Sequence, residues 1–185
     1  MHECKLTTTA ETTYVEYIAI EFARDVSIQG PNFSTTQENV VKEYMQRNPP
    51  DYVVFNTGLH DTALNDSSPS TYQENLDWYA SLFSTLQPVP KLTFIATTPV
   101  KRDVQPPEWQ EITADSRIYE YNERALKVMQ RHGASFIDPW PLLRLPYWQS
   151  MYSDGVHILK GNDPAYYHAM AWMVLSVTCG YVKIR

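Results

Sequence analysis

The chain has 185 residues, of which 43% are hydrophobic, 13% aromatic and 19% charged. This composition predicts one folded domain over residues 1–185 and excludes a disordered chain, which would carry fewer apolar and more charged residues. The formal charge of −6 comes without any basic stripe, so binding to nucleic acid through its phosphates is not expected.

The first ten residues are polar and do not resemble a signal peptide. The longest apolar run, near residues 169–177, is shorter than the roughly 20 residues that span a bilayer. We therefore expect no membrane insertion by this chain. A secretion signal outside these residues is compatible with the sequence.

Strand-like and helix-like segments alternate along the chain. β-Branched and aromatic residues favour strands at 13–22, 51–56, 91–97 and 134–138, and helical spacing of apolar residues favours helices at 37–47, 70–86, 115–132 and 164–178. Ser70 is the expected N-cap of the second helix and Gly133 the expected stop of the third, whereas 139–152 is expected to be an aromatic loop. This order predicts an α/β fold, a three-layer α/β/α sandwich around a mostly parallel sheet.

One candidate for chemistry is the segment Asp154-Gly155-Val156-His157, which precedes the last predicted helix. An imidazole can act as a general base, and a nearby carboxylate can hold its tautomer and stabilise its charged form. Such a pair needs a hydroxyl nucleophile from elsewhere. The same four residues also fit a plain turn with a partly buried histidine.

A second candidate is Gly58-Leu59-His60-Asp61, directly after the predicted strand 51–56. Parallel α/β sheets place their sites just past the carboxyl ends of strands. A glycine there allows close approach of backbone to a ligand, and its N–H with a His60 donor suits a developing oxyanion. The competing interpretation is an ordinary turn after a strand.

Together the two segments resemble the SGNH/GDSL hydrolase superfamily. Residues 51–61 (DYVVFNTGLHD) resemble its third sequence block and residues 153–157 (SDGVH) its fifth, most closely as they occur in the PC-esterase branch of GDSL-like acyl-esterases. The resemblance, which extends over residues 13–179, implies an SGNH or flavodoxin-like sandwich that hydrolyses or transfers ester-linked acyl groups without a cofactor. It implies a small-molecule or carbohydrate ester substrate, often an O-acetylated sugar.

By that resemblance, His157 is the catalytic base and Asp154 its partner, while Gly58 and His60 occupy the oxyanion or substrate positions. The family has asparagine where this chain has His60. A neutral histidine donates from one ring nitrogen and a charged one from both, so His60 serves either the oxyanion or the substrate.

The Gly-Asp-Ser turn that supplies the family's nucleophile does not occur in the sequence. We expect the chain to begin at the fold's second strand, with the first strand and the serine upstream of Met1. The alternative is an inactive SGNH-like domain that binds a glycan or a protein partner.

Two further groups of residues are candidate sites. His60 and Asp61, with the Asp154 and His157 pair, have irregular spacing for metal ligands, and no metal is expected. The aromatic residues that precede the Asp154 segment could stack on a sugar, but core packing is expected of them. They are Trp140, Tyr147, Trp148 and Tyr152. His132 is expected to cap its helix, not to bind a ligand.

Overall fold

The computed structural model describes residues 45–47, 50–63, 68–146, 150, 152, 155–156 and 176. The predicted strand 13–22 lies outside them, as do most of the predicted helices 37–47 and 164–178. Within those two helices, residues 45–47 and Ser176 are described and are helical.

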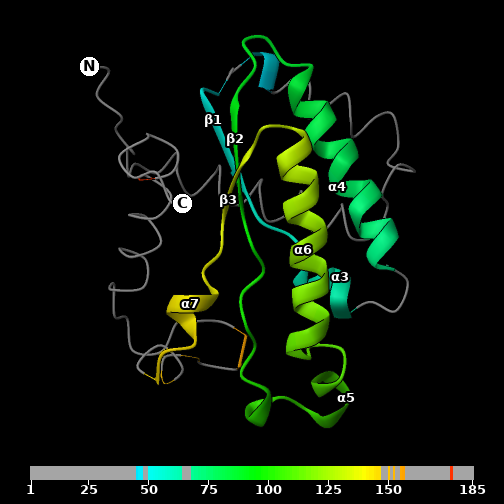
Figure 1. Ribbon diagram of the computed structural model, residues 1–185, viewed down its shortest axis with the longest axis vertical. Helices are drawn as coiled ribbons and strands as arrows, with labels where there is room; N and C mark the ends of the chain where they lie inside the picture. The colour runs from blue at the N-terminus through cyan, green and yellow to red at the C-terminus, as the bar shows by residue number, and fades with distance from the viewer. Residues whose placement is uncertain are drawn as a thin grey trace.

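Three parallel strands form the sheet of the described region, in the order β1-β2-β3 (Figure 1). They are β1 (Tyr52–Phe55), β2 (Lys91–Ile95) and β3 (Ser135–Ile137). Each lies inside a predicted strand, and both pairings are parallel as expected. The chain therefore has the predicted α/β fold with a parallel sheet.

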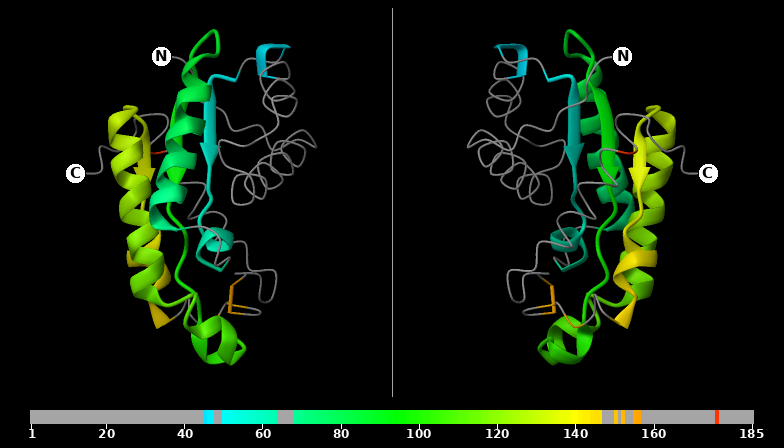
Figure 2. Two further views of the ribbon diagram at one scale, coloured as in Figure 1. Left: turned by 90° about the vertical axis from the view of Figure 1, so that its right-hand side faces the viewer. Right: turned by 90° about the vertical axis from the view of Figure 1, so that its left-hand side faces the viewer.

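Two long helices, α4 (Pro69–Ser84) and α6 (Asp115–Arg131), cover one face of this sheet (Figure 2). The register places Phe55, Phe94 and Phe136 in one row across the three strands. Adjacent rings of this row lie 5.2 and 5.8 Å apart between centroids. The row packs against buried residues of both helices, including Leu76 and Val128. Burial of this apolar surface is the main force that holds the helices on the sheet.

Both long helices were predicted within two residues at each end, but the N-cap of α4 was wrong. The cap is Ser68, whose Oγ accepts a hydrogen bond from Thr71 N at 3.1 Å. Proline is favoured in the first turn of a helix because its missing N–H would have no partner there, so the helix begins at Pro69, before Ser70. The predicted stop of α6 is confirmed: His132 is the C-cap and Gly133 has φ +63°.

Several short helices follow the strands. They are α3 (Leu59–Ala63), the 3₁₀ turn η2 (Arg102–Val104), α5 (Pro107–Gln110) and α7 (Trp140–Leu143). The last lies in a segment predicted to be loop. There the Asp138 carboxylate accepts a hydrogen bond from Trp140 N at 2.9 Å, which turns the chain into a helical conformation. None of the helices among the described residues has the length and apolar character needed to cross a bilayer.

Candidate active site

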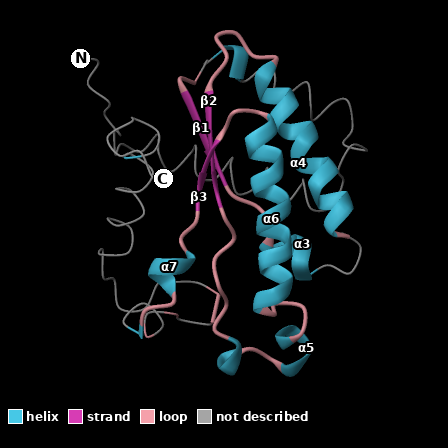
Figure 3. Ribbon diagram, in the orientation of Figure 1, coloured by secondary structure: helices cyan, strands magenta, loops and turns pink. Residues whose placement is uncertain are grey.

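The carboxyl ends of the three strands meet at one edge of the sheet. Residues 56–58 follow β1, residues 96–98 follow β2, and Asp138 follows β3. Because the strands are parallel, these segments emerge side by side, and α3, α5 and α7 lie beyond the same edge (Figure 3). This is the edge where the sequence predicts the site.

Gly58 joins β1 to α3 and has φ +135°, a backbone conformation that side chains rarely adopt. A Cβ atom at this position would overlap with Thr97 Oγ1. The Gly58 carbonyl accepts the first hydrogen bond of the helical turn, from Thr62 N at 2.9 Å. Only glycine combines this backbone angle with this close contact to the segment after β2.

The carbonyl oxygen of Thr57 is held by two buried hydroxyls. Tyr72, on α4, donates to it at 3.1 Å, and Thr97 Oγ1 donates to it at 2.9 Å. Asn122 of α6 fixes Thr97 in turn, because its amide accepts from Thr97 N at 2.9 Å and donates to Thr97 O at 3.0 Å. Trp140 Nε1 also donates to Thr97 O, at 2.7 Å. The end of β1 is thereby connected to both long helices.

Asp61 lies beneath this turn and is fully buried. Its Oδ2 accepts a hydrogen bond from Thr57 Oγ1 at 3.0 Å. Burial raises the pKa of Tyr72 well above its ordinary value, and the nearby Asp61 and Tyr121 raise it further. Tyr72 therefore keeps its proton at neutral pH and remains a donor to Thr57. We infer that the buried Asp61 stabilises the turn through its hydrogen bond with Thr57.

The Asp154–His157 segment is described at its two central residues, Gly155 and Val156; Asp154 and His157 lie outside the described part. Gly155 has φ +83°, and its carbonyl accepts from Lys101 N at 2.8 Å. A Cβ atom on Gly155 would overlap with Gln105 Nε2 and lie 2.6 Å from the Lys101 carbonyl oxygen. The turn therefore sits tightly against the segment that follows β2.

Leu59 and Val156 pack against one buried cluster, which consists of Val100, Ile118 and Trp140. Leu59 directly follows Gly58, and Val156 directly precedes His157. The structure thus brings the described parts of the two segments to the same edge of the sheet. His60 lies in α3 by its backbone, and its side chain is outside the described part.

The sequence pattern does not single out Tyr72, Thr97 or Asn122, although all three support the Gly58 turn. Tyr72 and Asn122 are polar residues on the apolar, sheet-facing sides of their helices, and both are buried. A buried polar group needs a partner, so such interruptions of an apolar face are the signal that identifies residues of this kind.

Two of the aromatic residues that could stack on a sugar belong to the core. Trp140 is 1% exposed and Tyr152 is 5% exposed, and the Tyr152 hydroxyl donates to the Pro99 carbonyl at 2.5 Å. Core packing is confirmed for both; Tyr147 and Trp148 lie outside the described residues. Within the described part of the chain, no three His, Cys, Asp or Glu side chains gather as potential metal ligands.

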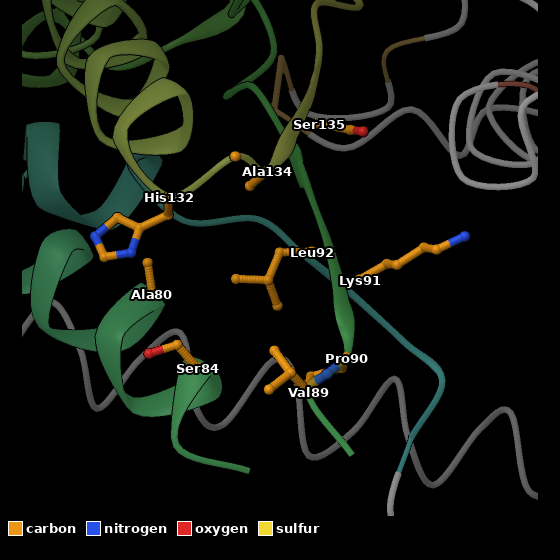
Figure 4. Close-up of a pocket in the computed structure, with 10 residues that line it drawn as sticks. Ala80, Ser84, Val89, Pro90, Lys91, Leu92, His132, Ala134 and Ser135 are labelled. Carbon is orange, nitrogen blue, oxygen red and sulfur yellow. The ribbon is translucent and has the colours of Figure 1, made fainter. Parts of the chain in front are cut away.

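A cavity of about 390 Å³ lies at the opposite, amino-terminal edge of the sheet. In Figure 4, Ala80, Leu92 and His132 surround it, whereas Lys91 and Ser135 extend away from it. His132 Nε2 lies 3.0 Å from Asp77 Oδ1, which joins the end of α6 to α4. This cavity is separate from the Gly58 turn.

Comparison with known proteins gives a match to the model of the GDSL-like lipase/acylhydrolase family over residues 6–159. No protein in a search of curated sequences matches significantly.

Three solved structures share the fold. A lipase/acylhydrolase from Enterococcus faecalis is 18% identical with a TM-score of 0.58, and the match covers 80% of this chain and 70% of that one. An α/β hydrolase from the metagenome of Lake Arreo is 18% identical with a TM-score of 0.57, covering 87% and 69%. A protein from Lactobacillus plantarum is 15% identical with a TM-score of 0.58, covering 83% and 77%.

Proposed function

Because this chain belongs to the GDSL-like lipase/acylhydrolase family, we propose that it acts in the hydrolysis of carboxylic esters or the transfer of their acyl groups by a serine–histidine–aspartate mechanism, whose serine is not assigned to any of these 185 residues. The family supports an esterase-type function with small-molecule ester substrates. The mechanism and the residues that perform it are our proposal.

In this mechanism His157 takes the proton of a serine hydroxyl as its oxygen attacks the ester carbonyl carbon. Collapse of the tetrahedral intermediate breaks the bond to the alcohol, which leaves with the proton from His157. Water, or an acceptor hydroxyl in a transferase, then gives its proton to His157 and attacks the acyl-serine; the bond to the serine oxygen breaks, and the serine leaves with that proton from His157. Asp154 orients the imidazole and stabilises its charged form. No cofactor is needed.

The observation that carries this proposal is the shared packing of Leu59 and Val156 on one buried cluster. It supports a single site, because the residues beside Gly58 and His157 are held on the same group of side chains. The hydrogen bond from Lys101 N to Gly155 O further supports the placement of the Asp154–His157 turn at this edge.

Gly58 N–H and the ring of His60 are the proposed donors to the oxyanion. Backbone N–H groups serve this purpose well because their dipoles are already oriented before the charge develops. His60, in place of the asparagine of the resembling family, serves either as the second donor or as a contact to the alcohol part of the substrate.

The finer substrate assignment rests on the resemblance of residues 51–61 and 153–157 to the PC-esterase branch. That resemblance favours an acyl ester on a carbohydrate, and acetyl is the group most often found there. A polysaccharide carrying O-acetyl groups is therefore the first natural substrate to test.

The test is the rate of p-nitrophenyl acetate hydrolysis by the full-length protein as wild type, His157→Ala and Asp154→Asn. We expect each substitution to lower kcat about 100- to 10,000-fold, because general-base catalysis contributes on that order. His132→Ala, which changes a histidine at the opposite edge of the sheet, is the matched control and should retain the wild-type rate. Equal rates for the wild type and His157→Ala would remove His157 from the mechanism.

A fluorophosphonate probe followed by peptide mapping identifies the nucleophile. This reagent reacts with an activated serine, so one labelled serine is expected, and labelling should disappear in His157→Ala. Labelling that survives this substitution would contradict activation by His157.

A second candidate function is binding without catalysis, to a glycan or a protein partner. It is favoured by one observation: no Gly-Asp-Ser occurs in the 185 residues. A chain that neither hydrolyses p-nitrophenyl acetate nor reacts with the probe, but binds an acetylated polysaccharide in calorimetry, would favour this second function over the first.

A further inference from the structure

Among the described residues, the peptide unit between Thr57 and Gly58 is held through its carbonyl oxygen. Its carbonyl oxygen accepts hydrogen bonds from Tyr72 and from Thr97, at 3.1 and 2.9 Å. The two donors come from different elements, α4 and the segment after β2. Both donors are buried, at 0% and 2% exposure, so water does not compete for this oxygen.

In a trans peptide, the C=O and the following N–H point in opposite directions. The Thr57–Gly58 peptide is trans. The hydroxyls of Tyr72 and Thr97 therefore fix the direction of Gly58 N–H as well, and they aim it away from themselves. Among the described residues, none accepts a hydrogen bond from Gly58 N–H.

We propose that Tyr72 and Thr97 are positioning residues, which set the orientation of the Gly58 N–H as an oxyanion donor. This inference rests on the function proposed above and adds to it two residues that do not touch the substrate. A donor contributes most when its direction is set before the reaction, and two hydroxyls on the opposite end of the same peptide achieve this.

The positions of both hydroxyls are themselves determined by the core. The side-chain amide of Asn122 forms hydrogen bonds with both the backbone N–H and the carbonyl of Thr97. Trp140 also donates to the Thr97 carbonyl, which gives three hydrogen bonds to the Thr97 backbone. The ring of Tyr72 packs against that of Tyr121, with centroids 5.0 Å apart. Neither hydroxyl can follow a movement of the Gly58 turn without disturbing these contacts.

The support from Tyr72 and Thr97 is necessary because residue 58 is a glycine. The Gly58 backbone tolerates a wide range of angles, so the Thr57–Gly58 peptide is free to rotate when its carbonyl loses its partners. A rotated peptide would aim the N–H away from the oxyanion. Loss of either hydroxyl should therefore lower kcat more than it raises KM, because the oxyanion forms only in the transition state.

The experiment compares Thr97→Val and Tyr72→Phe with two matched controls. Thr93→Val removes a buried hydroxyl from the same strand region, and Tyr79→Phe removes one from the same helix; both residues are about 1% exposed. We expect kcat on p-nitrophenyl acetate to fall roughly 10- to 100-fold in the first two variants, with KM within about twofold. Both controls should stay near the wild-type kcat, and Thr97→Ser, which keeps the hydroxyl, should restore it.

A second readout observes the peptide directly. Thr57-Gly58 is the only threonine–glycine pair in the sequence, so labelling threonine carbonyls with ¹³C and glycine amides with ¹⁵N gives one HNCO signal. The Thr57 carbonyl should shift upfield in Thr97→Val and in Tyr72→Phe, because it loses a hydrogen-bond donor. It should remain in place in the two controls.

The outcomes separate this inference from the proposed function. A wild type that hydrolyses no ester overturns the proposed function. If the wild type is active, any of three results would overturn the positioning role alone. Thr97→Val and Tyr72→Phe could keep the wild-type kcat, Thr97→Ser could be as slow as Thr97→Val, or kcat could fall equally in the two controls.

Discussion

Gly58 and Gly133 both have positive φ but differ in what surrounds them. At Gly58 a Cβ atom would overlap with Thr97 Oγ1 and would lie 3.3 Å from the Tyr72 hydroxyl. At Gly133, which ends α6, nothing lies within 4 Å of a Cβ atom. The first glycine is needed for both its backbone angle and its contacts, whereas the second is needed for its angle alone.

This difference predicts unequal costs of substitution by alanine. Gly58→Ala should lower the free energy of unfolding by about 2–4 kcal/mol, since backbone strain and overpacking both contribute. Gly133→Ala, the matched control, should lower it by about 1 kcal/mol through the backbone angle alone. Urea denaturation of both variants gives the comparison. Equal losses would mean that the contact with Thr97 is less tight than the structure shows.

At the scale of elements, polar contacts at two positions along the helices join α4 and α6, in addition to their apolar contact. Arg124 donates to the Gln73 side chain at 3.1 Å, and nearer the amino-terminal edge of the sheet Asp77 accepts from Arg131 at 2.8 Å. The hydrogen bond from His132 holds the pKa of Asp77 below its ordinary value of 3.8, and Arg131 lowers it further. The stability of this end of the helix pair therefore depends on whether Asp77 is protonated.

A carboxyl group with a lowered pKa in the folded protein stabilises it above the unfolded pKa, and this contribution is lost as the pH falls through the folded pKa. The wild type should therefore be more stable than Asp77→Asn at pH 6, by less than about 1 kcal/mol because the pair is about half exposed. The difference should shrink as the pH falls below 3.8.

Thermal unfolding of both proteins between pH 6 and pH 2.5 measures this. Added salt at pH 6 is the control and should also reduce the difference, because exposed charges are screened. A difference that grew on acidification would have the wrong sign for this ion pair.

At the scale of the whole molecule, the two edges of the parallel sheet have different properties. The carboxyl edge carries the Gly58 turn, the Gly155 contact and the cluster that both segments share. The amino-terminal edge carries the cavity beside His132. We propose that the chemistry takes place at the carboxyl edge, although this cavity lies at the other.

Gly155→Ala tests this assignment. Its Cβ atom would meet the backbone oxygen of Lys101, so the turn between Asp154 and His157 must shift, and kcat on p-nitrophenyl acetate should fall at least about 10-fold. Ser84→Ala, which alters the lining of the cavity, should leave kcat unchanged. A fall in kcat with Ser84→Ala alone would place the reaction at the cavity.

The sequence by itself determined the class of fold and two candidate segments. Strand and helix periodicities depend on residues close together in the chain, so strands at 51–56, 91–97 and 134–138 and helices near 70–86 and 115–132 were predictable from local patterns. Gly58 was identifiable because a glycine after a buried strand is a local signal. The N-cap at Ser68 and the helix α7 were missed, since single hydrogen bonds decide them.

Only the tertiary structure decided what surrounds the Gly58 turn. Tyr72 lies 15 positions from Thr57 in the chain, Thr97 lies 40 positions from it, and Asn122 lies a further 25 from Thr97. No local pattern relates residues so far apart; they meet because parallel pairing aligns the strand ends and apolar burial holds both helices on the same face. That packing directs two hydroxyls at one carbonyl, and the rigidity of the peptide bond transmits their direction to the Gly58 N–H.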